Sequence, residues 1–383
     1  MLPYTHPSRC CGCGACVSVC PAGALSLQED EDGFLYPVCE EEKCTQCGAC
    51  RAQCGMMRPV SNVPLAVYAA AERDAEQRKR STSGGMFAAF ATVVLSEGGL
   101  AFGAALDESL EPVHRSISFL SQLPLLQGSK YVQSRIGRAY EEARAALEGG
   151  RTVLFSGTPC QIAGLYGFLG EKSYPNLITM DLICHGTPPA KFFRDYRAFL
   201  EEKAGEPLSA FLFRDKGSGW GLCGKAVYET ASGQKREEVL RGEDCSYYDL
   251  FLHGEFYRES CFACPFACRH RPADLTVGDF WGIEVCHPVW MADAGGPFDP
   301  RGGISSLIVN TENGRCWLKR FEPALILRPS TFENAARRNL QLTEAPRRSP
   351  RQDEVRALYH AGGYAALDRF ALERLSKEGA IKP

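Results

Sequence analysis

The stretch RCCGCGACVSVCP, residues 9–21, is repeated with an offset of 34 residues in CTQCGACRAQCG, residues 44–55. Subtracting 34 from cysteine positions 44, 47, 50 and 54 gives 10, 13, 16 and 20, all of which are also cysteines. The Gly-Ala pairs at 14–15 and 48–49 match in the same register. The repeat therefore opens at Cys10, and Cys11 and Cys39 are left outside it.

The spacing of each run, x2-x2-x3 between cysteines with Pro21 after the first run, is typical of bacterial ferredoxins with two [4Fe–4S] clusters. In such proteins, the fourth cysteine of each run binds the cluster of the other run. Zinc is the alternative, but it is usually bound by two separated pairs of cysteines or by a mixture of cysteine and histidine. Two runs of four cysteines fit that pattern poorly. We therefore expect a ferredoxin domain over residues 1–57, in which the metal supplies much of the stability. Its expected ligands are Cys10, Cys13, Cys16 and Cys54 for one cluster, and Cys44, Cys47, Cys50 and Cys20 for the other.

Composition supports a metal protein rather than a disulfide framework. The 383 residues include 19 cysteines and carry a net charge of −3. The first ten residues, MLPYTHPSRC, lack the apolar segment of a signal peptide, so we expect a cytoplasmic protein. The longest apolar run, MFAAFATVVL, is about half a membrane span, and we expect no transmembrane segment. The charge gives no sign of nucleic-acid binding, and the arginines between 337 and 351 are interpreted as solvated surface.

After a short linker at residues 56–64, the pattern becomes α/β. Strands are expected at AVYAAA and GLAFGAAL, at Val153–Phe155 and in LITMDLIC, with helices at residues 83–99 and in GRAYEEARAALEGG. We divide this region into residues 64–150 and 151–315, followed by a helical tail over residues 316–383.

A third cysteine group, Cys261, Cys264 and Cys268, has the spacing x2 then x3. Radical-SAM enzymes have the reverse order, x3 then x2, so that class is not indicated. Three cysteines this close suit a third [4Fe–4S] cluster, and zinc or unligated thiols are the alternatives. We favour Cys184 as fourth ligand, because an apolar strand delivers it to a sheet edge. Cys160, at a helix start, is the second choice, and Cys245 and Cys286 are the other candidates.

Two glycine-containing turns precede expected helices: STSGG at residues 81–85 and GTPCQ at residues 157–161. Each is either an anion site at a helix N-terminus or a simple helix cap. Lys130 either neutralises a phosphate or lies on the surface. His185 either protonates a substrate or is structural.

The segments STSGG, QGSKYVQS, GTPCQIAGL, DLICHG and CFACPFACRHRPADLTVGDFWG occur in order over roughly residues 64–310. Together they resemble the beta-subunit family of coenzyme F420 hydrogenases and dehydrogenases, which is related to 7-hydroxymethyl chlorophyll reductase. The resemblance implies an α/β (α+β) flavoprotein core that binds FAD beside a [4Fe–4S] cluster, here with an N-terminal ferredoxin-like domain.

The resemblance implies an oxidoreductase that passes electrons between a two-electron donor or acceptor at FAD and iron–sulfur clusters. A flavin can divide an electron pair into the single electrons that clusters accept. The implied partners are a redox protein or subunit and a deazaflavin or nicotinamide-type substrate; the alternative is a flavin-free polyferredoxin. The implied cluster ligands are Cys261, Cys264 and Cys268. The expected flavin contacts are Ser81, Thr82, Ser83, Gly84, Gly85, Lys130, Gly157, Thr158, Pro159, Cys160 and Asp279.

Overall fold

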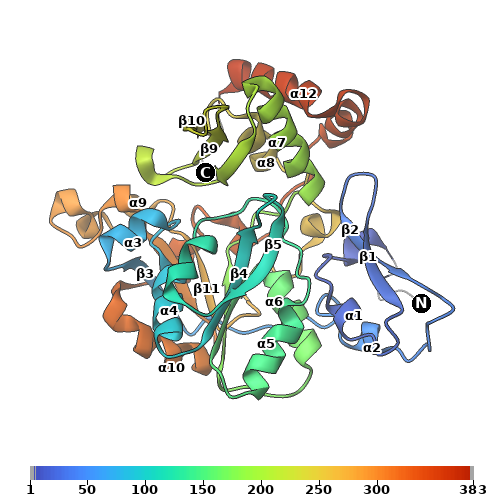
Figure 1. Ribbon diagram of the computed structural model, residues 1–383. Helices are drawn as coiled ribbons and strands as arrows, with labels where there is room; N and C mark the ends of the chain where they lie inside the picture. The colour runs from blue at the N-terminus through green and yellow to red at the C-terminus, as the bar shows by residue number, and fades with distance from the viewer. Residues whose placement is uncertain (1–3, 5, 380–383) are drawn as a thin grey trace.

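The computed structural model describes residue 4 and residues 6–379, and it divides the chain into a small cysteine-rich module and two larger layers (Figure 1). The module contains the antiparallel pair β1 (Leu25–Glu29) and β2 (Leu35–Cys39) and two one-turn helices, α1 (Ala15–Ser18) and α2 (Ala49–Ala52). The two helices are offset by 34 residues and each follows a left-handed glycine, Gly14 or Gly48. The sequence repeat is therefore also a structural repeat.

The main layer is built on an eight-stranded sheet with the order β13-β3-β12-β11-β7-β6-β4-β5. Its four central strands are parallel: β4 (Leu100–Leu106), β6 (Val153–Gly157), β7 (Leu177–Leu182) and β11 (Leu275–Asp279). The outer strands pair antiparallel: β3 (Ala66–Glu72), β5 (Pro112–Ile117), β12 (Ser305–Val309) and β13 (Leu325–Ser330). The expected mixed α/β fold is confirmed.

Helices cover both faces of this sheet because apolar side chains alternate along its strands. In β6, Leu154 packs with α4 (Met86–Ser96) and α10 (Glu312–Phe321). Its neighbours Val153 and Phe155 pack on the other face with α5 (Ala139–Glu148) and α6 (Pro159–Leu169). Three shorter helices, α3 (Ala75–Arg80), α9 (Ile283–Cys286) and α11 (Phe332–Ala336), lie toward the β13 side.

The second layer, at the top of Figure 1, is a three-stranded antiparallel sheet covered by helices. Its strands are β8 (Leu208–Leu212), β9 (Cys223–Glu229) and β10 (Lys235–Arg241), and its helices are α7 (Ala190–Ala204), α8 (Ser246–Leu252) and α12 (Gln352–Glu378). Aromatic side chains from all three helices form its core. In the described part of the chain, no helix is both long enough and apolar enough to span a membrane.

The stretch 316–383 is not the wholly helical tail that we expected. Residues Leu325–Ser330 form β13, which pairs with β3 at one edge of the main sheet. The six residues of this strand include one buried position and show no regular alternation of buried and exposed side chains, and the partner strand lies more than 250 residues earlier in the sequence. Local periodicity could not reveal that pairing, because it depends on a distant strand.

The cysteine-rich module packs on α6 through glycines. Gly164 and Gly167 follow Cys160 by four and seven residues, so all three lie on one face of the helix. A Cβ at Gly164 would lie 2.8 Å from the Cys13 sulfur, and one at Gly167 would lie 2.0 Å from the Gln53 carbonyl oxygen. Side chains at these positions would therefore push the module away from the main layer.

Candidate functional site

One small cavity in the cysteine-rich module is lined by four of the cysteines expected to bind one cluster. It measures ≈ 40 Å³ and its lining includes Cys20, Cys44, Cys47 and Cys50. Cys39, from the end of β2, also lines it. Three closely spaced thiols from one run and the last thiol of the other run therefore face one space, as a ferredoxin-type cluster requires.

The other four repeat cysteines, Cys10, Cys13, Cys16 and Cys54, also lie near one another. Burial raises the pKa of Cys10 to about 11, and the charges of Cys13 and Cys54 act in the same direction. Burial also raises the pKa of Cys16, to which Cys13, Cys10 and Cys54 contribute. These mutual effects show thiols gathered in a desolvated space, where a cluster would be the group that favours their ionised form.

A third group of thiols lies where the main layer meets the module: Cys160 at the start of α6, Cys184 just after β7, and Cys261 and Cys264. Burial raises the pKa of Cys184 well above its usual range, and the charges of Cys261, Cys160 and Cys264 add to this. Burial raises the pKa of Cys264 to about 12, with further contributions from Cys160 and Cys261.

Cys268 has different neighbours. Its thiol donates to the carbonyl oxygens of Pro265 at 3.4 Å and His270 at 3.2 Å. The structure thus gathers the first two of the four sequence candidates for fourth ligand, Cys184 and Cys160, beside Cys261 and Cys264. Cys245 is elsewhere, at 3.3 Å from the Tyr196 hydroxyl in the core of the second layer.

Cys11, which the repeat left unexplained, connects the module to this third group. Its side chain is only 5% exposed. Contacts with the Cys13 and Cys160 thiols raise the pKa of Cys11 well above its usual range, since its single S–H can donate to either of them. The interaction with Cys11 lowers the pKa of Cys160 to about 7. The first ferredoxin site and the third group are therefore separated by a single thiol.

Across residues 4 and 6–379, no three His, Cys, Asp or Glu side chains converge tightly enough to hold a single metal ion. A [4Fe–4S] cluster does not need such convergence, because it binds each of its thiolates at a separate corner. The three groups of thiols described above each bring cysteines together around one space, which is the arrangement that a cluster requires.

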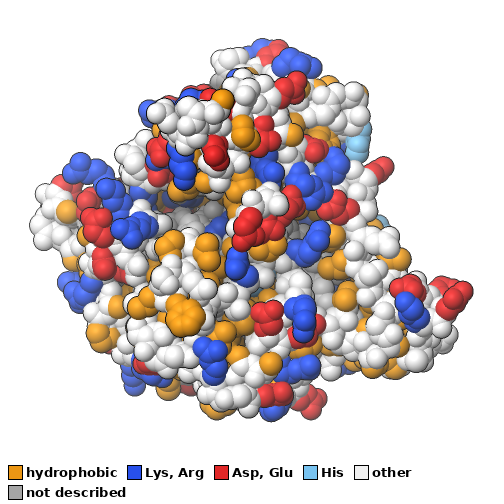
Figure 2. Space-filling view, in the orientation of Figure 1, with side chains coloured by type: hydrophobic (Ala, Val, Ile, Leu, Met, Phe, Trp, Pro, Cys, Tyr) orange, Lys and Arg blue, Asp and Glu red, His pale blue; other side chains and the backbone are white. Residues whose placement is uncertain are grey.

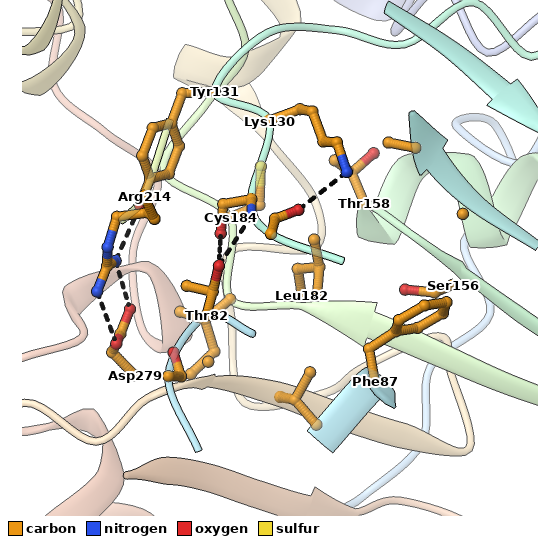
Figure 3. Close-up of a pocket in the computed structure, with 18 of the residues that line it drawn as sticks. Thr82, Phe87, Lys130, Tyr131, Ser156, Thr158, Leu182, Cys184, Arg214 and Asp279 are labelled. Atoms are coloured by element: carbon orange, nitrogen blue, oxygen red, sulfur yellow. Dashed lines mark hydrogen bonds and ion pairs between the residues drawn. The ribbon is translucent and has the colours of Figure 1, made fainter. Parts of the chain in front are cut away.

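A cavity of ≈ 240 Å³ opens beside the third group, between the main and second layers. Figure 2 shows the surface hollowed between these layers, and Figure 3 shows the interior, with Cys184 and Leu182 between Lys130 on one side and Arg214 on the other. Cys184 both lines this cavity and neighbours Cys261 and Cys264.

Most of the expected flavin contacts line this cavity. They are Ser81, Thr82, Ser83, Gly85, Lys130, Gly157, Thr158 and Asp279. Gly84, Pro159 and Cys160 do not line it. Within the 81–85 loop, the Gly84 amide instead donates to the Ser305 hydroxyl at 2.9 Å. His185 also lines the cavity, and its pKa is lowered by burial.

The helices α4 and α6 begin at this cavity, so their N-terminal amides and positive dipole ends are available to an anion there. The Lys130 Nζ donates to the carbonyl oxygens of Gln127 at 2.9 Å and Gly128 at 3.1 Å. Burial lowers the pKa of Lys130 to about 7. An anionic group in the cavity would restore the charge of this lysine.

Arg214 is a cavity residue that sequence reasoning missed. It is buried, and its guanidinium donates to Asp279 at 3.2 Å and to the Tyr131 hydroxyl at 3.0 Å (Figure 3). Burial opposes ionisation of Asp279, but the Arg214 charge holds the pKa of this carboxyl below its usual range. The Trp220 indole also donates to Asp279. Arg214 follows strand β8 of the second layer, so no local motif connects it with the GDFWG segment.

Comparison with known proteins matches two parts of the chain to described families. Residues 150–334 match the family model for the C-terminal part of the coenzyme F420 hydrogenase/dehydrogenase beta subunit, and residues 9–56 match the 4Fe-4S dicluster domain. An uncharacterised ferredoxin from Methanocaldococcus jannaschii is 32% identical over 72 residues, which cover 19% of this chain and 87% of that protein.

Among solved structures, the F420-reducing [NiFe] hydrogenase complex from Methanosarcina barkeri is similar to this chain. The TM-score is 0.41 at 15% identity, and the alignment covers 83% of this chain and 92% of that chain. The family resemblance stated from the sequence motifs is confirmed by the two family models. The chain is an iron–sulfur electron-transfer protein with a 4Fe-4S dicluster domain, and through residues 150–334 it is related to the coenzyme F420 hydrogenase/dehydrogenase beta subunit.

Proposed function

We propose that this chain is an FAD-dependent oxidoreductase that passes electrons between a two-electron donor or acceptor and three [4Fe–4S] clusters. One observation carries the proposal: Cys184 lines the large cavity and also belongs to the third group of thiols. A redox-active ring in that cavity would therefore lie beside a cluster held by Cys184.

The residues around the cavity fit a flavin nucleotide. The N-termini of α4 and α6, together with Lys130, supply amides and a cation for a diphosphate. Met180, Leu182 and Val277 supply an apolar floor for a planar ring. When bound, FAD supplies the capacity to exchange electrons in pairs or singly. The protein's part is to orient the ring against Cys184 and to exclude water from it.

We assign the clusters from the grouping of the thiols. The first is held by Cys10, Cys13, Cys16 and Cys54, and the second by Cys20, Cys44, Cys47 and Cys50. For the third, Cys160 is a better fourth ligand than Cys268, because its thiol lies with those of Cys184, Cys261 and Cys264. Cys268 would have to give up its two carbonyl contacts to join them.

The resulting order of sites is cavity, third cluster, first ferredoxin cluster, second ferredoxin cluster. The contact of Cys11 with Cys13 and Cys160 supports the middle step. The exposed thiol of Cys47 puts the second ferredoxin site near the surface, where a redox partner protein would exchange electrons. A deazaflavin or nicotinamide-type compound is the substrate class that we propose for the cavity.

Anaerobic reconstitution with iron, sulfide and FAD tests the proposal. We expect about twelve irons per chain, since three cubanes carry four each, together with one FAD that is released on denaturation. A screen of a deazaflavin coenzyme, NADH, NADPH and reduced ferredoxin as reductants then identifies the partner class. Iron without flavin would favour the flavin-free electron carrier, and zinc in place of iron in the third site would contradict the relay.

A further inference from the structure

Arg258 is a buried cation at the junction between the cysteine-rich module and the main layer. Its side chain is 1% exposed. Its guanidinium donates to Gln133 Oε1 at 3.2 Å, to the Cys10 carbonyl oxygen at 3.3 Å and to the Leu35 carbonyl oxygen at 2.9 Å. The same group lies over the rings of Phe34 and Tyr36, at 5.1 Å and 4.6 Å from their centroids. All these partners are neutral.

The other buried arginines are paired with carboxylates. Arg271 pairs with Asp181, Arg214 with Asp279, and Arg374 with Asp249 and Glu255. Among the described residues, no carboxylate lies within ion-pair distance of Arg258. A buried charge without a counter-charge is costly, because neutral hydrogen bonds replace only part of the lost solvation. A negative charge close to Arg258 would therefore stabilise this buried cation.

The Asp30 carboxyl, on which Arg258 acts from beyond ion-pair distance, supplies part of this negative charge. Thiols on both sides of the junction can supply more. The Arg258 guanidinium donates to the carbonyl oxygen of Cys10, and the backbone amide of Cys261 donates to the carbonyl oxygen of Arg258 at 2.9 Å. The Arg258 charge also lies close enough to act on the thiols of Cys13 and Cys160. Two of these cysteines belong to the first ferredoxin site and two to the third group.

The sequence makes room for this contact at Gly12. This residue has a φ of +67°, and a Cβ there would lie 2.6 Å from a terminal nitrogen of Arg258 and 2.8 Å from the Leu35 carbonyl oxygen. Glycine thus lets the guanidinium rest on the backbone between Cys10 and Cys13. On the other side, Arg258 directly precedes the short helix Glu259–Ala263 that carries Cys261.

We infer that Arg258 is the shared counter-charge of the first ferredoxin cluster and the third cluster, and that it raises the reduction potential of both. The inference rests on the ligand sets proposed above. A cluster bound by four thiolates is an anion, and reduction adds one more negative charge. A fixed cation beside it favours the reduced form, and the low-dielectric surroundings strengthen the effect. Arg258 is a positioning residue here, since it acts through the clusters and exchanges no electrons itself.

The test is an anaerobic redox titration of the holoprotein, read by electron paramagnetic resonance, in R258Q, R258M and R258K. For R258Q and R258M we expect the ratio of reduced to oxidised cluster at a fixed potential to fall at least tenfold at the first and third sites. This corresponds to a reduction potential that is lower by at least about 59 mV. R258K keeps the charge, and its ratios should stay within tenfold of wild type.

Two controls separate charge from structure. Arg194, on α7, joins the second layer to the module through Glu29 at 2.7 Å, but its nearest partners are carboxylates. R194Q should therefore leave all three potentials unchanged. The second ferredoxin site is an internal control: it adjoins Cys39, at the opposite end of β2 from Leu35, about 13 Å along the strand.

Each outcome decides something. Unchanged potentials in a fully loaded R258Q or R258M protein overturn the inference while leaving the proposed function intact. If neither R258Q nor R258M incorporates its clusters, R258K answers the question. Normal cluster content and normal reduction potentials in R258K support the role of Arg258 as a counter-charge. A loss in R258K as large as in R258M indicates only a structural clamp, because lysine cannot make the same three contacts. Wild-type protein that binds no iron would instead refute the proposed function.

Discussion

The guanidinium of Arg271 donates to the carboxylate of Asp181 at 3.0 Å, and both side chains are buried. Arg271 also donates to the carbonyl oxygens of Phe266 and Leu182, each at 2.7 Å. Asp181 and Leu182 end strand β7, which delivers Cys184, and Phe266 lies in the loop that carries Cys264 and Cys268. This ion pair therefore fixes two sources of cluster ligands relative to each other.

Replacing Arg271 by methionine should lower the free energy of unfolding by about 3–5 kcal/mol, because Asp181 is then left as an unpaired buried charge. It should also lower the iron content of the third site. Arg269→Met is the matched control: Arg269 lies on the same loop but pairs with Glu333 at the surface, so about 0–1 kcal/mol is expected. Denaturant titration and iron analysis measure both effects. Equal losses in the two variants would contradict the role given to Asp181.

Replacing Cys264 by serine should uncouple the cavity from the ferredoxin sites. Serine is a poor ligand for iron, so the third cluster would be lost or altered while the flavin contacts remain. In rapid-mixing experiments, we expect flavin reduction at the wild-type rate and ferredoxin-cluster reduction slowed at least about tenfold. Cys316→Ser, at an exposed cysteine on α10, is the control and should match wild type. Normal reduction of both groups in Cys264→Ser would show that the relay order is wrong.

The Gly12–Arg258 contact predicts a difference between two glycine substitutions in the module. Gly12 and Gly23 both have positive φ angles, +67° and +58°. An added Cβ meets the Arg258 guanidinium at Gly12, whereas nothing lies within 4 Å of it at Gly23. Gly12→Ala should therefore cost about 1–3 kcal/mol more than Gly23→Ala, as overpacking does. Thermal unfolding of the loaded proteins measures this, and equal losses would show that only backbone strain matters.

The sequence predicts best where local spacing determines the structure. The 34-residue repeat predicts two equivalent glycine-initiated turns, because each cysteine run has to wrap a cluster in the same way. The predicted strand in GLAFGAAL is confirmed as β4, which pairs antiparallel with β5, the next strand in the sequence. The apolar run Val153–Phe155 is confirmed as the start of β6.

Contacts between distant segments could not be predicted in the same way. Cys160, Cys184 and Cys264 meet only because α6, β7 and the 261–271 loop converge, and Cys268 follows the x3 spacing yet bonds to nearby carbonyls. Nothing local marks Arg258 as different from other arginines, since its lack of a carboxylate partner is a property of the fold. The nearest signal is in α6, where glycines follow Cys160 at helical spacing and indicate a close neighbour on that face.

Lys130 predicts a pH dependence of FAD binding. Burial lowers its pKa to about 7, so in the flavin-free protein this lysine is protonated below pH 7 and increasingly neutral above it. A diphosphate nearby favours the protonated form and raises the pKa, so binding takes up a proton. Affinity should therefore be highest below pH 7 and fall by up to about tenfold per pH unit above it, until the pKa of the bound state is reached.

Lys216 offers the matched control for this prediction. Burial also lowers the pKa of Lys216 to about 7, and its Nζ donates to the carbonyl oxygens of Arg78, Ser83 and Gly302 at 2.8, 2.5 and 2.7 Å. It does not line the cavity. Lys130→Met should bind FAD with a nearly pH-independent Kd, whereas Lys216→Met should keep the wild-type slope. Fluorescence titration of FAD between pH 6 and 9 measures the slopes. If Lys130→Met kept the wild-type pH dependence of the Kd, protonation of Lys130 could not be its source. The diphosphate would then have to bind away from Lys130.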